Sequence, residues 1–144
     1  QFEGRRKRIS PHLVRAPWEP VDETRRQFYD GLLSVLRQPA VRDGHWQLLE
    51  CRPAWDGNWT WDGFLACSWQ GPGAERLLVT VNEAGHQGQC HVRLPFDDLL
   101  GQAVRLQDRL SPAVYDRPGD DLLVPGLYLD MPGWGYHVFE VIRG

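Results

Sequence analysis

Three tryptophans and two polar side chains that could bind a sugar lie close together in residues 55–61. Indole faces are large and rigid and can stack on the apolar side of a pyranose ring, while carboxylate and amide groups can hydrogen-bond its hydroxyls. Tryptophan also dominates burial in cores and interfaces, so the same segment could serve packing alone. Both interpretations stay open, and the candidate carbohydrate-binding residues are Trp55, Asp56, Asn58, Trp59 and Trp61. If Trp59 and Trp61 lie on a strand, they share a face.

The usual ligands of zinc, histidine and cysteine, come together at His86, Cys90 and His91. Their spacing matches no zinc signature, and neighbouring residues of a strand point to opposite faces, which separates Cys90 from His91. We therefore expect a structural thiol and an exposed imidazole. Cys51 and Cys67 fall within expected strands and should behave as small buried hydrophobes. No flanking pattern supports a nucleophilic Cys–His pair.

Two acidic pairs, Asp97-Asp98 and Asp120-Asp121, are candidates for calcium, which takes about six to eight oxygen ligands. Neither pair belongs to a loop with alternating oxygen donors. We expect Asp97 to cap a short turn and the second pair to lie in a solvated hairpin connection. The sequence therefore predicts no metal and no cofactor.

The composition is that of one ordinary globular domain. The chain has 144 residues, of which 42% are hydrophobic and 24% charged, and single domains of about 100–150 residues are common. Three cysteines leave one unpaired under any intramolecular pairing, which favours a reducing, cytoplasmic compartment. No apolar run approaches the roughly 20 residues needed to cross a bilayer, so no membrane partner is expected.

Charge is divided unevenly along the chain, whose formal net charge is −3. Residues 1–42 hold nine Lys or Arg and five Asp or Glu, whereas residues 43–144 hold seven and fourteen. The basic run at 5–8 could attract phosphate, but it is short, lacks interleaved stacking aromatics and precedes an acidic body. We therefore expect no nucleic-acid partner.

One amphipathic helix is the first element that must position these residues. Residues 1–20 carry three prolines and no sustained period, which predicts an irregular or extended leader. Asp22 can cap a following helix, and Pro39 is expected to end it. Gly31 would allow close packing on a neighbour. The apolar stripe of this helix is formed by Phe28, Tyr29, Leu32, Leu33 and Leu36.

After residue 40 the pattern changes to short apolar or alternating runs broken by glycine, proline and aspartate. The expected strands are 45–51, 63–69, 76–82, 89–94, 103–109, 112–116, 126–130 and 136–142. Such spacing without a second long helix favours an antiparallel sandwich or barrel. The last run has no cleanly polar face and is expected in the middle of a sheet. The predicted fold is mainly β, an antiparallel β-sandwich of about eight strands preceded by one amphipathic helix and a proline-rich leader.

Seven segments, taken in order, carry a resemblance to a known family. They are QFEGR (1–5), FYDGLL (28–33), GHWQLL (44–49), LLVTVN (77–82), VRLP (92–95), GLYLD (126–130) and YHVFEV (136–141). Their order and spacing resemble the C-terminal end of α-amylase-superfamily glycoside hydrolases. The resemblance implies that residues 1–40 correspond to the close of the (β/α)8 barrel and residues 41–144 to the C-terminal β-sandwich.

In that family the nucleophilic aspartate, the acid/base glutamate and the stabilising aspartate follow the fourth, fifth and seventh barrel strands. By this resemblance all three would lie upstream of residue 1. Retaining hydrolysis needs two carboxyl groups about 5 Å apart in a cleft, so the chain alone is expected to be inactive and to hold no catalytic residue. Glu3 and Arg5 would sit at the rim of the barrel.

The resemblance thus implies a noncatalytic C-terminal domain of a glycoside hydrolase or transglycosidase acting on α-glucans. Its partners would be the catalytic barrel, which it stabilises, and α-glucan. The alternative is an autonomous carbohydrate-binding module that uses the segment 55–61. The apolar face of the helix is also expected to support self-association, since large exposed apolar patches find partners.

Overall fold

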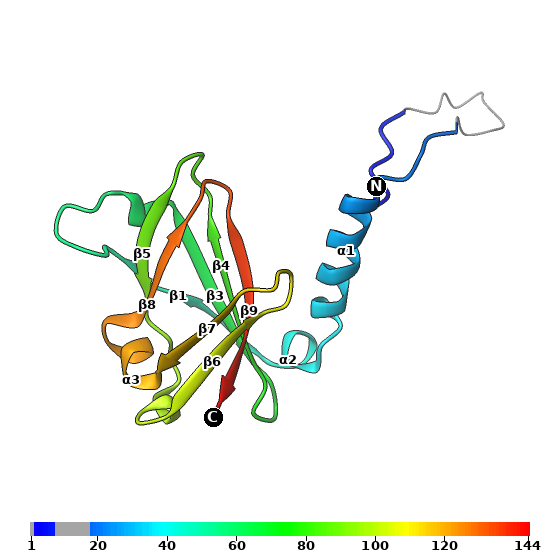
Figure 1. The fold of residues 1–144 in the computed structure, drawn as a ribbon. Coiled ribbons are helices and arrows are strands. Elements are labelled where there is room, and N and C mark those ends of the chain that lie inside the picture. The colour runs from blue at the N-terminus through cyan, green and yellow to red at the C-terminus, as the bar shows by residue number, and fades with distance from the viewer. Residues whose placement is uncertain (1, 8–17) are drawn as a thin grey trace.

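The computed structural model describes residues 2–7 and 18–144 of the protein. Two antiparallel sheets pack face to face, with one long helix beside them (Figure 1). The expected mainly β fold class is confirmed. Part of the expected irregular leader, residues 1 and 8–17, lies outside the described residues. In the part of the chain that is described, no helix is long and apolar enough to cross a membrane.

The strands of the described chain form a larger and a smaller sheet. They are β1 (His45–Leu49), β2 (Cys51–Arg52), β3 (Phe64–Gln70), β4 (Arg76–Asn82), β5 (Gly88–Val92), β6 (Ala103–Asp108), β7 (Val114–Pro118), β8 (Leu127–Met131) and β9 (Tyr136–Arg143). The larger sheet has the order β1-β3-β4-β9-β6-β7, and the smaller one β2-β5-β8. The expected strand at 45–51 is two strands, because Glu50 between them belongs to neither. Its first part pairs with β3 and its second with β5.

The last strand, β9, lies inside the larger sheet, as expected. It pairs with β4 on one side and with β6 on the other. Its residues Phe139 and Val141 belong to the main core, while Val138 is buried on the opposite face. Each face of β9 therefore carries buried apolar side chains, which is why the run has no cleanly polar face.

The helical elements are short apart from the first. They are α1 (Glu23–Leu36), α2 (Pro39–Arg42), η1 (Thr60–Gly63), η2 (Asp97–Leu99), α3 (Gly119–Asp121) and η3 (Leu122–Gly126). Asp22 caps α1 as expected, since its Oδ1 accepts a hydrogen bond from the Arg25 amide at 3.1 Å. Pro39 does not end α1 directly. It starts α2, where its missing N–H has no intrahelical partner to lose.

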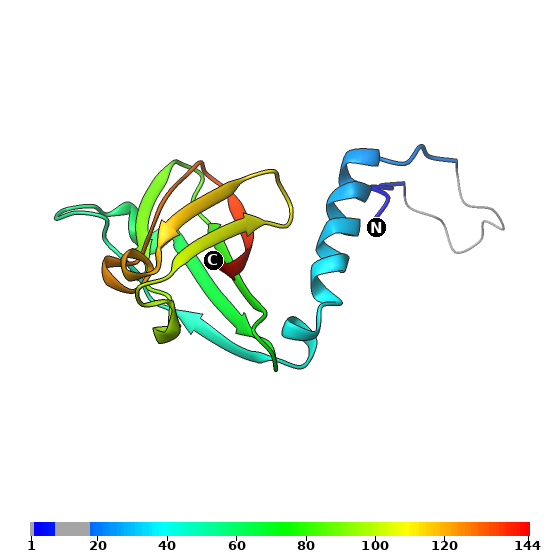
Figure 2. The same ribbon diagram turned by 60° about the horizontal axis from the view of Figure 1, so that its bottom comes forward.

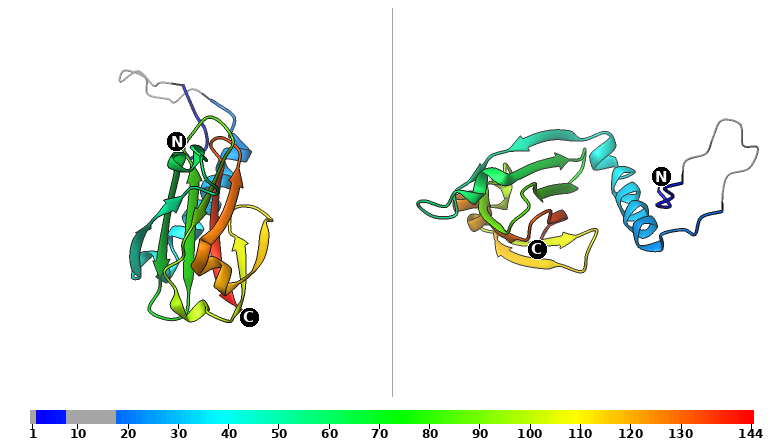
Figure 3. Two further views of the ribbon diagram at one scale, coloured as in Figure 1. Left: turned by 90° about the vertical axis from the view of Figure 1, so that its left-hand side faces the viewer. Right: turned by 90° about the horizontal axis from the view of Figure 1, so that it is seen from above.

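The main core lies between the two sheets, with fully buried side chains such as Leu78, Leu106 and Phe139. A smaller cluster lies on the outer side of the larger sheet. There Val35 and Ala40 from α1 and α2 meet buried residues of β4 and β9. Figures 2 and 3 show α1 outside the sandwich, and not between the sheets.

Two expectations for the acidic pairs are wrong. The N-cap of η2 is Phe96, and Asp97 is the first residue of the turn, so Asp97 is not its cap. The neighbouring Asp98 instead pairs with Arg76 and Arg143 at 2.8 Å each. Asp120 and Asp121 form α3, in a connection that crosses from the larger sheet to the smaller one and is not a hairpin.

Candidate functional site

The segment 55–61 lies in the loop between β2 and β3, and its side chains separate into two groups. Trp55, Asp56 and Trp59 are exposed. Asn58 is buried: its Oδ1 accepts from the Ala54 amide at 3.3 Å, and its Nδ2 donates to the Thr60 hydroxyl at 2.9 Å. Trp61 packs against the main core. The loop therefore offers solvent two indoles, while Asn58 holds its shape.

Trp59 and Trp61 do not share a strand face. Trp59 is the N-cap of the 3-10 turn η1, and Trp61 lies within that turn. In this geometry the two rings diverge: Trp59 is 69% exposed and Trp61 is half-buried. The Thr60 hydroxyl accepts from the Gln89 amide at 2.9 Å, which fixes the turn to β5.

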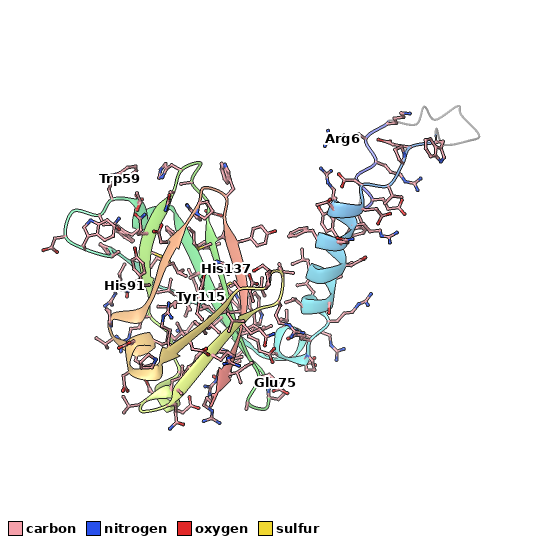
Figure 4. The ribbon with its side chains drawn as sticks, in the orientation of Figure 1. Arg6, Trp59, Glu75, His91, Tyr115 and His137 are labelled. Atoms are coloured by element: carbon pink, nitrogen blue, oxygen red, sulfur yellow. The ribbon has the colours of Figure 1, made fainter. Side chains whose placement is uncertain are left out.

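Trp59 lies at the same end of the sandwich as the β4–β5 and β8–β9 connections (Figure 4). Two further aromatic residues, His86 and Trp134, come from these connections. The His86 ring lies 5.0 Å from the Trp59 ring, centroid to centroid. Trp134 is also 69% exposed, and its indole atoms lie 3.7–3.9 Å from the place that a Cβ on Gly85 would occupy. Sequence reasoning treated His86 only as a metal ligand and did not consider Trp134. The sequence feature that could have identified Trp134 is its place in the short connection between the expected strands 126–130 and 136–142.

A buried asparagine holds the two connections that carry His86 and Trp134. The Asn82 side chain is fully buried, and its Nδ2 donates to the carbonyl oxygens of His86, Met131 and Pro132 at 2.9–3.1 Å. Its Oδ1 accepts from the Ala84 amide at 3.1 Å. All hydrogen-bonding groups of this amide point to the β4–β5 and β8–β9 connections. Both connections lie at the end of the sandwich away from the C-terminus (Figure 1).

The two connections also touch through their backbones. A Cβ on Gly133 would lie 2.5 Å from the Gly85 carbonyl carbon, so only glycine fits there. The next residue, Trp134, has a φ of 61°, the left-handed region that a bulky residue rarely adopts. Its amide donates to the Ala84 carbonyl at 3.0 Å. The strained backbone conformation is thus held in place by the neighbouring connection.

A second candidate surface is the outer face of the larger sheet over β1, β3 and β4. By register, Trp46 lies opposite Trp69 and Trp69 opposite Leu77, all on this face. Trp46, Leu48 and Leu65 are 51%, 55% and 43% exposed. We name this surface the outer apolar face. Its members are Trp46, Leu48, Leu65, Cys67, Trp69, Leu77, Val79 and Val81.

Helix α1 covers only part of the larger sheet. The Phe28 ring contacts the Tyr136 ring with centroids 5.6 Å apart. A Cβ on Gly31 would lie 3.1 Å from the Leu110 side chain, so the glycine permits the close approach expected for it. Phe28 and Leu36 remain partly exposed on the helix. These contacts lie towards β9 and the β6–β7 hairpin, and Trp46, Leu48 and Leu65 on β1 and β3 stay exposed.

Asp108, Ser111 and His137 form a cluster of the three residue types found in hydrolase triads. The Ser111 hydroxyl donates to Asp108 Oδ2 at 2.6 Å, and His137 Nδ1 lies 2.8 Å from the same oxygen. In a triad the serine must bond to the histidine that takes its proton. Here serine and histidine both bond to the aspartate, so the cluster has no nucleophile–base pair.

The cluster has a structural role instead. Burial raises the pKa of Asp108, but bonds from Ser111, His137 and the amides of Leu110 and Val138 outweigh that effect and hold the pKa below its ordinary value. A carboxylate that accepts several hydrogen bonds is stabilised in its charged form. Asp108 therefore joins the β6–β7 hairpin to β9.

Cys90 and His91 point to opposite faces, as expected. Cys90 lies in the core beside Cys51, and that contact together with burial raises the pKa of the Cys90 thiol. The expectation of an exposed imidazole is wrong: His91 is half-buried, because its ring lies against the η3 segment with Nδ1 3.1 Å from the Gly126 carbonyl oxygen. Cys67 is also only half-buried, on the outer apolar face. Over the described ranges, no three His, Cys, Asp or Glu residues gather into a possible metal site.

Glu3 and Arg5 form an ion pair at 2.7 Å, with both side chains about half exposed. The Glu3 carbonyl accepts from the Asp22 amide at 3.0 Å, which places this pair beside the start of α1. No family model matches the chain, and no curated protein matches it. The end of the sandwich at Trp59 and the outer apolar face are therefore the two candidate functional surfaces of the described residues.

Proposed function

We propose that the chain is the noncatalytic C-terminal region of an α-amylase-superfamily glycoside hydrolase or transglycosidase acting on α-glucans. Its role is to cover and stabilise the catalytic barrel. The order of the seven resembling segments suggests the family, and the outer apolar face carries the argument for the role.

The outer apolar face carries apolar side chains where a sheet face in contact with water normally carries polar ones. An antiparallel sheet with one solvated face alternates apolar residues inward with polar residues outward. On β1 and β3 the outward residues Trp46, Leu48 and Leu65 are apolar and exposed. Contiguous exposed apolar residues of this kind mark interaction surfaces. A neighbouring domain seated on β1 and β3 would remove them from water.

The start of the chain lies on the same side of the molecule. The Phe2 ring packs edge-on against the Tyr29 ring of α1, with centroids 5.1 Å apart. Helix α1 itself stands beside the larger sheet (Figure 2). A barrel joined upstream of residue 2 would therefore reach the outer apolar face without crossing the smaller sheet.

The test compares the 144-residue chain with the same gene product extended upstream of residue 1. We expect the extended protein to cleave or transfer α-1,4-glucan and to protect the amides of β1 from hydrogen exchange. Leu48→Glu combined with Leu65→Glu should lower the melting temperature of the extended protein, by about 2–4 °C for each kcal/mol lost. The melting temperature of the 144-residue chain should change much less, because both side chains are exposed in it and such substitutions cost little.

The matched control is Tyr128→Glu, an exposed aromatic on the smaller sheet, which should change neither protein. An extended protein without a catalytic barrel would contradict the proposal. Equal melting temperatures for the extended protein and its double variant would contradict the docking role.

A second candidate function is an autonomous carbohydrate-binding module based on the segment 55–61. The exposure of Trp55 and Trp59 favours it. Of the five candidate residues, these two indoles and Asp56 are open to a ligand. Asn58 is buried, and Trp61 packs against the main core. This function requires glucan binding by the 144-residue chain that is lost in Trp55→Ala and in Trp59→Ala.

A further inference from the structure

We infer that the end of the sandwich formed by Trp59, His86 and Trp134 is a binding platform for a neutral oligosaccharide. The platform differs from the segment 55–61, because it joins one residue of that segment to the β4–β5 and β8–β9 connections. The identity of the sugar as an α-glucan rests on the proposed function; the platform itself does not.

The first support is the arrangement of the aromatic residues. Trp59 lies against His86 at 5.0 Å, and Trp134 lies against Gly85, the residue before His86. The two indoles therefore flank one turn, and both remain 69% exposed. Packing alone does not account for them, because a tryptophan that packs against the core is more covered than these two, as the half-buried Trp61 is.

The second support is the strain at Trp134. A φ of 61° costs free energy for a bulky residue such as tryptophan. Glycine or asparagine at this position would lower that cost. Backbone strain of this kind persists where the surroundings fix it and is concentrated at binding sites. Here Asn82 and the Gly85–Gly133 contact fix it. The indole is thus presented in one position before any ligand arrives, which lowers the entropic cost of binding.

The third support is the polar network beside the rings. Gln87 and Gln89 both donate from Nε2 to Asp130 Oδ1, at 2.8 and 2.9 Å. Gln87 follows His86, and the Gln89 amide bonds to Thr60, the residue after Trp59. Exposed amides and a carboxylate beside apolar rings suit a ligand that is apolar on its face and hydroxylated at its edge.

The charge of the surroundings decides against other ligands. Asp62, Glu83 and Asp130 lie on the same connections and strands as the platform, so a polyanion such as RNA would be repelled. A neutral sugar ring carries no such penalty. An apolar protein partner would leave the Gln87–Asp130 network facing hydrocarbon, which is costly for polar groups.

The experiment titrates the 144-residue chain with maltoheptaose up to roughly millimolar concentration while recording the indole N–H signals by NMR. We expect saturable shifts of the Trp59 and Trp134 signals, assigned with single variants, and no shift for Trp46. Trp134→Gly removes the ring and relieves the backbone strain. It should weaken binding about tenfold or more while the melting temperature stays equal or rises.

Trp46→Ala is the matched control, because it removes an indole that is also exposed, at 51%, from the outer apolar face and should leave binding unchanged. His86→Ala should weaken binding less than Trp134→Gly. The inference is overturned if neither maltoheptaose nor cellohexaose shifts an indole signal, or if the Trp55 and Trp59 signals shift without Trp134. Binding of cellohexaose but not maltoheptaose would keep the platform and contradict the α-glucan assignment of the proposed function.

Discussion

The two outer faces of the sandwich share one core but differ in chemistry. The smaller sheet presents polar side chains joined by hydrogen bonds, as between Gln89 and Asp130, with the half-exposed Tyr128 among them. The larger sheet presents the outer apolar face over β1, β3 and β4, of which α1 covers only the side towards β9. The strand pattern of the smaller sheet suits water. The pattern of the larger sheet suits a neighbour, so one sandwich combines a solvent face and a contact face.

The largest effect should come from the interior that the two faces share. Phe139→Ala removes a fully buried ring between the sheets and should lower the free energy of unfolding by about 3–5 kcal/mol in urea titrations. Leu48→Ala on the outer apolar face should cost less than about 1 kcal/mol. Equal costs for the two variants would make the outer apolar face part of the chain's own core and would end the comparison.

An intermediate effect is expected at Asp108, whose side chain joins the β6–β7 hairpin to β9. Its folded pKa lies below the unfolded value of about 3.9, so its stabilising contribution is full above that pH and is lost as the pH falls through the lowered pKa. Asp108→Asn should cost about 2 kcal/mol at pH 7. Thermal unfolding from pH 7 to pH 2 should show a smaller acid loss for the variant than for the parent chain.

The smallest change in folding free energy should come from charges placed on the faces themselves. Leu48→Glu with Leu65→Glu and, separately, Tyr128→Glu should each alter the free energy of unfolding by about 0.5–1 kcal/mol at most. Sedimentation velocity should distinguish them. We expect the parent chain to self-associate at high concentration, the double variant to be monomeric and Tyr128→Glu to behave as the parent. A sharp monomer for the parent chain would count against the contact face.

Much of the fold followed from periodicity. The cap at Asp22, the close approach at Gly31, the central place of β9 and nearly all strand positions could be predicted, because each depends on local spacing. The division of residues 45–51 between two sheets could not, since the one-residue interruption at Glu50 leaves the apolar pattern unchanged. The place of Asp97 inside its turn, with Phe96 at the N-cap position, could not be predicted from local spacing either.

The candidate site was harder to predict than the fold. Sequence reasoning found Trp59 through its neighbours in the segment 55–61 but missed Trp134, which comes from a different connection. The two are related through Asn82 and the 85–86 turn, by contacts between residues about 50 positions apart in the chain. Which of the tryptophans is buried also depended on the 3-10 geometry of η1, where a strand would have placed Trp59 and Trp61 alike.

The positive φ of Trp134 has a consequence for natural variation. A substitution by glycine or asparagine at this position would raise the stability of the fold, because either residue adopts the left-handed backbone conformation at lower cost. If the proposed platform is correct, selection for its ring explains why a tryptophan stands there. Descendants of this chain that no longer need a ligand at that turn should therefore have lost the indole while keeping Asn82 and Gly133, which the fold requires for itself.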